Sequence, residues 1–113
     1  MKKTFSKFVA VAILASAFPS YGICSSAVTA RVLQFGTYGN GNLFVSFDKP
    51  IDEAGCTMAY LELPANAPAF KTVLASVTLA FATNALVEIK TDSCFMGVPS
   101  FSGARPAYLA LKQ

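Results

Sequence analysis

Apolar and polar residues alternate with a period of two in the region after position 27, which is the spacing of half-buried β-strands. In residues 43–48 (LFVSFD), every second side chain, at Leu43, Val45 and Phe47, is apolar and points to one face. Residues 28–36 (VTARVLQFG) alternate as well, but the phase slips by one position after Val32, which predicts a bulge or a bend. Asn40-Gly41 in the connection is typical of a tight hairpin turn. The two segments therefore predict a β-hairpin.

A third strand and a helix follow. Residues 56–64 (CTMAYLELP) alternate until Pro64, which ends the strand. Residues 65–84 then show spacings of three and four, the period of one helix face, at Phe70, Val73, Leu74, Val77 and Phe81. Asn84 stands where helices commonly end in a left-handed residue, and the period of two returns at 87–90. We therefore predict a helix that breaks into a strand, rather than a transmembrane segment.

The remaining segments predict a long loop and a last strand. Residues 91–106 are rich in Gly, Pro and Ser, and residues 107–113 form a short strand. The order is strand, strand, strand, helix, strand, strand in one mainly β domain, residues 28–113. Several small folds share this order, and one is the OB-fold, a five-stranded Greek-key barrel with a helix after its third strand. Because a small sheet must bend to close on itself, the phase slip favours a five-stranded OB-like barrel.

The start of the chain has the three-part layout of a secretory signal peptide: a basic segment, an apolar run of about eleven residues, and small residues. The run is shorter than the roughly twenty apolar residues that span a membrane. Cleavage after Gly22 and after Ala27 both place small residues at the required positions, but only the later cut removes Cys24 and leaves an even number of cysteines. We therefore predict a signal peptide over 1–27, with a cut after residue 22 as the alternative, and a secreted or periplasmic protein without a stable membrane anchor.

The two remaining cysteines, Cys56 and Cys94, are predicted to form a disulfide, because such bonds persist in an oxidising compartment. A bridge of this loop length stabilises a small domain by roughly 3–4 kcal/mol in the chain-entropy model. The alternatives are free thiols or a pairing that involves Cys24.

Charge and residue types exclude several functions. The chain has nine basic and six acidic residues, and removal of Lys2, Lys3 and Lys7 with the signal peptide leaves six of each. A neutral chain lacks the basic patch that nucleic acid requires, so nucleic acid is not an expected partner. The chain has no histidine, the usual general base and the commonest metal ligand. We expect no enzyme activity, no cofactor and no metal site. The acidic loop with Asp48, Asp52 and Glu53 is the remaining candidate for a hydrolase, and we interpret it as a solvated loop.

A resemblance to known proteins rests on LASVTLAFATNALVEIKTDSC (74–94) together with AGC (54–56). These segments resemble a group of small exported bacterial single-domain proteins with an OB-like fold, in which a helix ends in a Gly or Asn turn before a short strand and a cysteine. More distantly, the layout is similar to the B subunits of AB5-type toxins, which are exported OB-folds that form rings and bind glycans. The resemblance implies a binding role and a homo-oligomer, and no glycan-contact residue carries over.

An OB-fold presents its ligands to the loops after the first and fourth strands, which here are 37–42 and 91–106. Their aromatic, amide and guanidinium groups suit stacking on sugars and bonding to hydroxyls. We therefore predict a secreted or periplasmic non-enzymatic binding module for a glycan or another exported protein, with self-assembly. The alternative is an envelope accessory or inhibitor protein that acts by protein–protein contact. The candidate ligand-binding residues, for which turn chemistry and packing is the competing interpretation, are Tyr38, Asn40, Asn42, Phe95, Phe101 and Arg105.

Overall fold

The computed structural model describes residues 25–113, and most of the predicted signal peptide, with both the alternative cut after residue 22 and Cys24, lies outside them. Five antiparallel strands form one sheet in the order β3-β2-β1-β4-β7, and β5 pairs with β6 as a separate hairpin. The described residues are thus mainly β with one helix, as predicted. The elements are β1 (Val28–Thr37), β2 (Leu43–Ile51), β3 (Met58–Leu63), α2 (Phe70–Thr83), β4 (Leu86–Lys90), β5 (Ser93–Phe95), β6 (Val98–Ser100) and β7 (Tyr108–Lys112).

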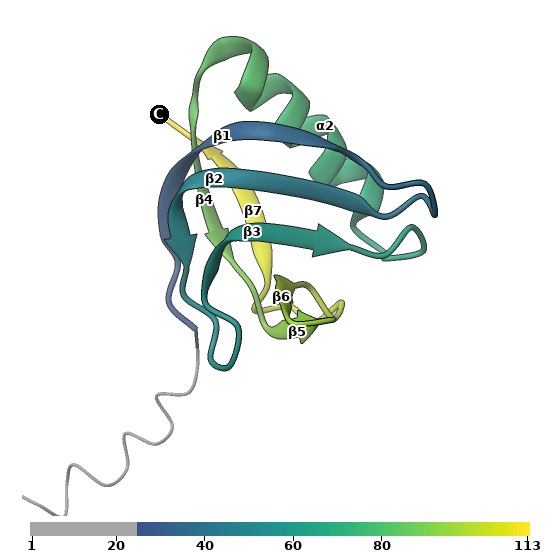
Figure 1. Ribbon diagram of the computed structural model, residues 1–113. Coiled ribbons are helices and arrows are strands. Elements are labelled where there is room, and N and C mark those ends of the chain that lie inside the picture. Colours follow the sequence, from purple (N-terminus) through teal and green to yellow (C-terminus); the bar gives the residue numbers. More distant parts are fainter. Residues whose placement is uncertain (1–24) are drawn as a thin grey trace, which may run out of the picture.

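The first strand is bent, as its phase slip predicts (Figure 1). Residues 28–31 pair with β4, whereas the part of β1 from Val32 onward pairs with β2. The register with β2 shifts between Val32 and Gln34, so the irregularity lies at the predicted position. This bulge lets one strand belong to both halves of the curved sheet.

The turn between β1 and β2 differs from the two-residue turn that Asn40-Gly41 predicts. Gly41 has a φ of 92°, whereas Asn40 does not have a positive φ. The backbone N–H of Tyr38 donates to the carbonyl of Asn42, and that of Gly41 donates to the carbonyl of Tyr38, both at 2.9 Å. The connection is therefore a three-residue loop in which only its last residue needs the conformation that glycine favours.

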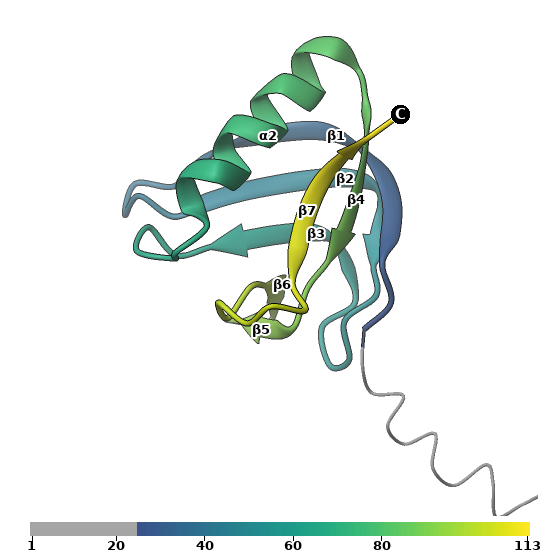
Figure 2. The same ribbon diagram turned by 180° about the vertical axis from the view of Figure 1, so that it is seen from behind.

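The helix α2 lies across one face of the curved sheet (Figure 2). Its buried positions are Val73, Val77 and Ala80. Phe81, which the helical spacing predicts to be buried, is 51% exposed. Ala80 faces the core in its place, and the ring of Phe81 only meets the edge of the Phe35 ring, with centroids 5.6 Å apart. The helical period identified the correct face but placed its edge one residue too far.

The two ends of α2 have different causes. The helix begins at Phe70 rather than at residues 66–68, where Pro68 favours a helix start, because residues 64–69 form turns in which Phe70 N–H donates to the carbonyl of Ala67 at 3.0 Å. It ends at Asn84, whose φ of 57° and ψ of 36° confirm the predicted left-handed cap. The N–H of Ala85 donates to the carbonyl of Ala80 at 3.0 Å, which closes the wide turn typical of such a cap.

The sheet does not close into the predicted barrel, because β3 and β7 remain its two edges. The β5–β6 hairpin, formed by residues that the sequence predicts to be loop, lies against β3 (Figure 1). The hydroxyl of Ser100 in β6 donates to the carbonyl of Glu62 in β3 at 2.6 Å. Strands of three residues are too short to show a period, which explains why the pattern missed them.

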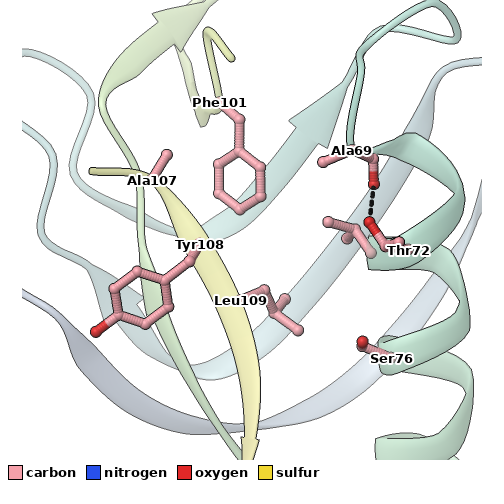
Figure 3. Close-up of a pocket in the computed structure, with 8 residues that line it drawn as sticks. Ala69, Thr72, Ser76, Phe101, Ala107, Tyr108 and Leu109 are labelled. Atoms are coloured by element: carbon pink, nitrogen blue, oxygen red, sulfur yellow. Dashed lines mark hydrogen bonds between the residues drawn. The ribbon is translucent and has the colours of Figure 1, made fainter. Parts of the chain in front are cut away.

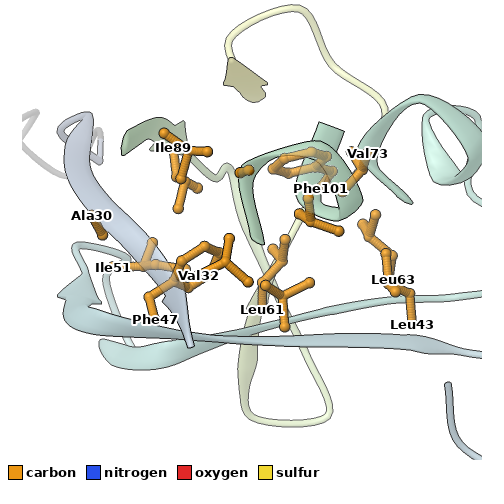
Figure 4. Close-up of a cluster of buried hydrophobic side chains, with 14 residues drawn as sticks. Ala30, Val32, Leu43, Phe47, Ile51, Leu61, Leu63, Val73, Ile89 and Phe101 are labelled. Atoms are coloured by element: carbon orange, nitrogen blue, oxygen red, sulfur yellow. The ribbon is translucent and has the colours of Figure 1, made fainter. Parts of the chain in front are cut away.

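One hydrophobic core fills the space between the curved sheet and α2 (Figure 4). Alternate residues of β2 and β3 provide its floor, as their period predicts, and the helix face and β4 cover it. The side chains that are fully excluded from solvent include Leu43, Val45, Ile51, Leu61, Leu63, Val77, Val87 and Ile89.

Candidate functional site

Two of the predicted ligand-binding side chains are committed to the fold. Phe101 is 8% exposed and belongs to the hydrophobic core. Asn42 is also 8% exposed. Its amide nitrogen donates to Glu62 Oε2 at 3.3 Å, and its Oδ1 accepts the backbone N–H of Ala65 at 3.0 Å. Both residues therefore hold elements together and leave little surface to a ligand.

The other four candidates are more accessible. Tyr38, Asn40 and Arg105 are exposed, and Phe95 is half-buried. Asn40 Oδ1 accepts the backbone N–H of Asn42 at 3.0 Å, so this amide shapes the turn while remaining accessible.

The two predicted ligand loops do not join into one surface. In both views the segment 64–69 lies between the β1–β2 turn and the loop after β6 (Figures 1 and 2). On one side Ala65 contacts the turn at Gly41, and on the other Pro68 lies beside Gly103. A ligand therefore meets either the turn or residues 91–106 first, rather than a cleft between them.

Residues 91–106 are tied to the fold by the predicted cysteine pair. Cys56, just before β3, and Cys94, in β5, lie at disulfide distance, with sulfurs 2.18 Å and Cα atoms 6.1 Å apart. This bond and the Ser100 contact with β3 fix the β5–β6 hairpin at its two strands. The pair confirms the predicted connectivity within the described residues.

The turn, in contrast, continues into a cluster of three aromatic rings on the outer face of the sheet, formed by Tyr38, Phe44 and Tyr60, which we call the aromatic surface. The centroids of Tyr38 and Phe44 are 4.9 Å apart, and those of Phe44 and Tyr60 are 6.0 Å apart with the rings nearly parallel at 13°. The hydroxyls of Tyr38 and Tyr60 contact each other. Tyr38 is 42% exposed, and the other two rings are half-buried.

The position of Phe44 explains the glycine opposite it. Gly36 and Phe44 are directly paired on β1 and β2. A Cβ atom at Gly36 would lie 3.0 Å from Cζ of Phe44, so the ring covers the bare backbone of the glycine. Phe44 and Tyr60 were not among the predicted site residues, although both lie on the outward face of adjacent predicted strands, which was the available signal.

Polar groups lie beside the rings. The strand register places Gln34, Ser46 and Tyr60 in one row across β1, β2 and β3 on the outer face. Burial, and then the hydrogen bond with Tyr38, raise the pKa of Tyr60 further above physiological pH than that of an ordinary tyrosine, and its hydroxyl stays neutral. The carboxamide of Gln34 and the hydroxyl of Ser46 thus lie beside the aromatic surface, and that row contains no basic group.

A small groove lies elsewhere, between α2 and β7 (Figure 3). Its volume is about 210 Å³, and its apolar walls include Val73, Phe101 and Leu109. Of its two helix hydroxyls, that of Thr72 donates to the carbonyl of Ala69 at 3.0 Å. The volume is below the roughly 300 Å³ at which ligand pockets usually begin, so the groove is a weaker candidate than the aromatic surface.

In the acidic loop that we predicted to be solvated, Asp48 and Asp52 are exposed, but Glu53 is not. Glu53 is only 7% exposed, and its carboxylate accepts hydroxyl groups. Asp48 accepts the backbone N–H of Arg31 at 2.8 Å, and Asp52 accepts that of Ser26 at 3.2 Å. The three carboxylates thus accept hydrogen bonds from different groups, and they do not converge on one site.

Two further features bear on the class of site. Among residues 25–113, no group of three or more His, Cys, Asp or Glu side chains is placed to hold a metal ion. Within the same residues, no helix has the length and apolar character to cross a membrane.

No protein-family model matches the chain, and no curated protein or solved structure is significantly similar to it.

Proposed function

We propose that this protein is an exported, non-enzymatic binding module and that it binds a glycan at the aromatic surface. The observation that carries the proposal is the partly exposed cluster of Tyr38, Phe44 and Tyr60 on the outer face of the sheet. Sugars lay their apolar C–H face on an aromatic ring while their hydroxyls bond to amides and hydroxyls, and the row through Gln34 and Ser46 supplies such groups beside the rings.

The fold supports the same class. The strand order β3-β2-β1-β4-β7 with α2 between β3 and β4 agrees with an OB-like domain whose barrel is open between its edge strands. The resemblance to small exported OB-like proteins, and distantly to the B subunits of AB5-type toxins, favours glycan binding with self-assembly. The Cys56–Cys94 pair is consistent with an oxidising location outside the cytoplasm, either periplasmic or secreted.

A glycan array probed with the purified exported protein tests the ligand class. For any glycan that binds, Tyr38→Ala should weaken affinity about ten-fold or more, because losing a stacking ring costs on the order of 1–3 kcal/mol by analogy with base stacking. Gln34→Ala should weaken it less. Tyr108→Ala is the matched control, since Tyr108 is a similarly exposed tyrosine (37%) on β7 at the far edge of the sheet.

Two results would contradict the proposal. One is binding that Tyr38→Ala leaves unchanged while Tyr108→Ala abolishes it. The other is an affinity for single-stranded nucleic acid that exceeds the affinity for every glycan, which a neutral mature chain should not show.

The second candidate function, protein–protein contact by an accessory or inhibitor protein, is favoured by the apolar side chains that α2 exposes. Leu79 and Phe81 are each 51% exposed on the helix. If this surface carries the function, Leu79→Ser should reduce formation of the protein–protein complex, as light scattering detects it, while Tyr38→Ala leaves that complex intact. Under the glycan proposal, Tyr38→Ala weakens glycan binding and Leu79→Ser does not.

A further inference from the structure

The residues just before β1 make specific contacts with the loop that follows β2. The hydroxyl of Ser25 donates to Glu53 Oε1 at 2.6 Å, and the backbone N–H of Ser26 donates to Asp52 Oδ2 at 3.2 Å. Both residues lie inside the signal peptide if cleavage occurs after Ala27, which is the cut that cysteine parity favours. The contacts therefore bear on where the mature protein begins.

Glu53 is a junction of the fold rather than a surface carboxylate. It is 7% exposed, and its Oε1 also accepts the hydroxyl of Thr91 at 2.5 Å. Its own carbonyl accepts the N–H of Cys56 at 3.1 Å and the hydroxyl of Thr57 at 2.9 Å. The residue thus connects the segment after β4 with the loop that leads to the disulfide.

A buried carboxylate destabilises a fold unless hydrogen bonds compensate for its lost hydration. In the described residues, Ser25 and Thr91 are the two side chains that donate to the Glu53 carboxylate. Thr91 is itself buried, at 1% exposure. A cut after Ala27 would remove one of the two donors and also the donor to Asp52.

We propose that the signal peptide is cleaved upstream of Ser25, after Gly22, so that the mature protein begins at Ile23 and Ser25 is part of the folded domain. Ser20 and Gly22 provide the small residues that such a cut requires. Cys56 and Cys94 pair with each other, so a cut after Gly22 leaves Cys24 as a third cysteine outside that pair. The hydrogen bonds of Ser25 and Ser26 are the observations that favour the earlier cut.

The first test is the intact mass of the protein recovered from the periplasm or the medium after expression of the full chain. The expected mass corresponds to a start at Ile23. A mass that corresponds to a start at Val28, or at any residue after Ser25, would overturn the proposal.

The second test is the thermal stability of two variants expressed and exported as the full chain. Ser25→Ala keeps a small residue at that position, so it suits either cleavage site, but it removes a donor to Glu53. It should lower the melting temperature by roughly 5–15 °C, since hydrogen bonds to charged groups are among the stronger ones and small domains are sensitive to their loss.

Ser26→Ala is the matched control, because the contact with Asp52 uses the backbone N–H, which alanine retains. It should leave the melting temperature unchanged. If the Ser25→Ala protein melts at the same temperature as the parent, the assigned role of Ser25 is wrong, whatever the mass shows.

Discussion

The aromatic surface and the segment 91–106 contain similar side chains, and the structure uses them in opposite ways. Tyr38 projects beside the rings of paired strands and is 42% exposed, whereas Phe101 turns into the space between sheet and helix and is 8% exposed. Both lie in segments that the sequence predicts to be ligand loops. The difference arises because the β1–β2 turn extends from the outer face of a sheet, while residues 91–106 fold back on its edge.

The β1–β2 turn and residues 91–106 are also held in place by different interactions. The turn is held by an amide, since Asn42 bonds both Glu62 and the backbone of Ala65. Residues 91–106 are held by a covalent bond, at Cys94, and by packing, at Phe101. A loop fixed by a few polar contacts leaves its rings free for a ligand, whereas a loop fixed by packing uses its rings for stability.

Truncation of each ring tests most directly whether the two regions contribute differently to stability. Phe101→Ala should lower the free energy of unfolding by about 3–5 kcal/mol, as for other buried aromatic residues. Tyr38→Ala should lower it by about 1 kcal/mol or less, because the ring is partly solvated. Urea denaturation measures both. Equal losses would show that the two regions play the same structural part.

Removal of the disulfide comes next in expected size. Cys94→Ser should cost about 2–4 kcal/mol, because the unfolded chain regains the freedom that the loop closure removes. Met96→Ala is the control in the same segment, since Met96 is 82% exposed, and it should change stability little. A thiol assay that finds Cys56 and Cys94 both reactive in the native exported protein would contradict the pairing.

The two asparagines of the turn, Asn40 and Asn42, are expected to contribute unequally to stability. Asn42→Ala should cost about 1–3 kcal/mol, because it leaves the N–H of Ala65 without its side-chain partner in a part-buried position. Asn40→Ala should cost less than about 1 kcal/mol, since it removes one bond at an exposed site. Thermal unfolding of the pair gives the order, and a larger effect for Asn40→Ala would refute the structural role of Asn42.

A position outside both regions has an expected effect below that of removing the disulfide. Asn84→Val should destabilise the protein by about 1–2 kcal/mol, because a β-branched residue resists the positive φ of 57° at the end of α2. Asn84→Gly should be neutral or slightly stabilising, since glycine adopts this conformation freely. Chemical denaturation of both variants checks the sign, and equal stability would remove the conformational reason for the helix end.

Local pattern was sufficient for several features of the fold. The hairpin of β1 and β2, the irregularity after Val32 and the helix end at Asn84 follow from periods and turn residues within a few positions of each other. The class, mainly β with one helix, follows from the order of those elements. These features depend on interactions between neighbours in the sequence, which is why one sequence was enough to predict them.

Other features depend on which segments meet in space, and only the tertiary structure decided them. The open edges at β3 and β7, and the hairpin that lies against β3, involve strands too short or too distant for a period to reveal. The cluster of Phe44 with Tyr38 and Tyr60 needed the register across strands, and the contact between Ser25 and Glu53 joins residues 28 positions apart. Sequence alone determined the longer strands and the helix and indicated the cysteine pair of this protein, whereas packing between distant residues decided which side chains reached the surface.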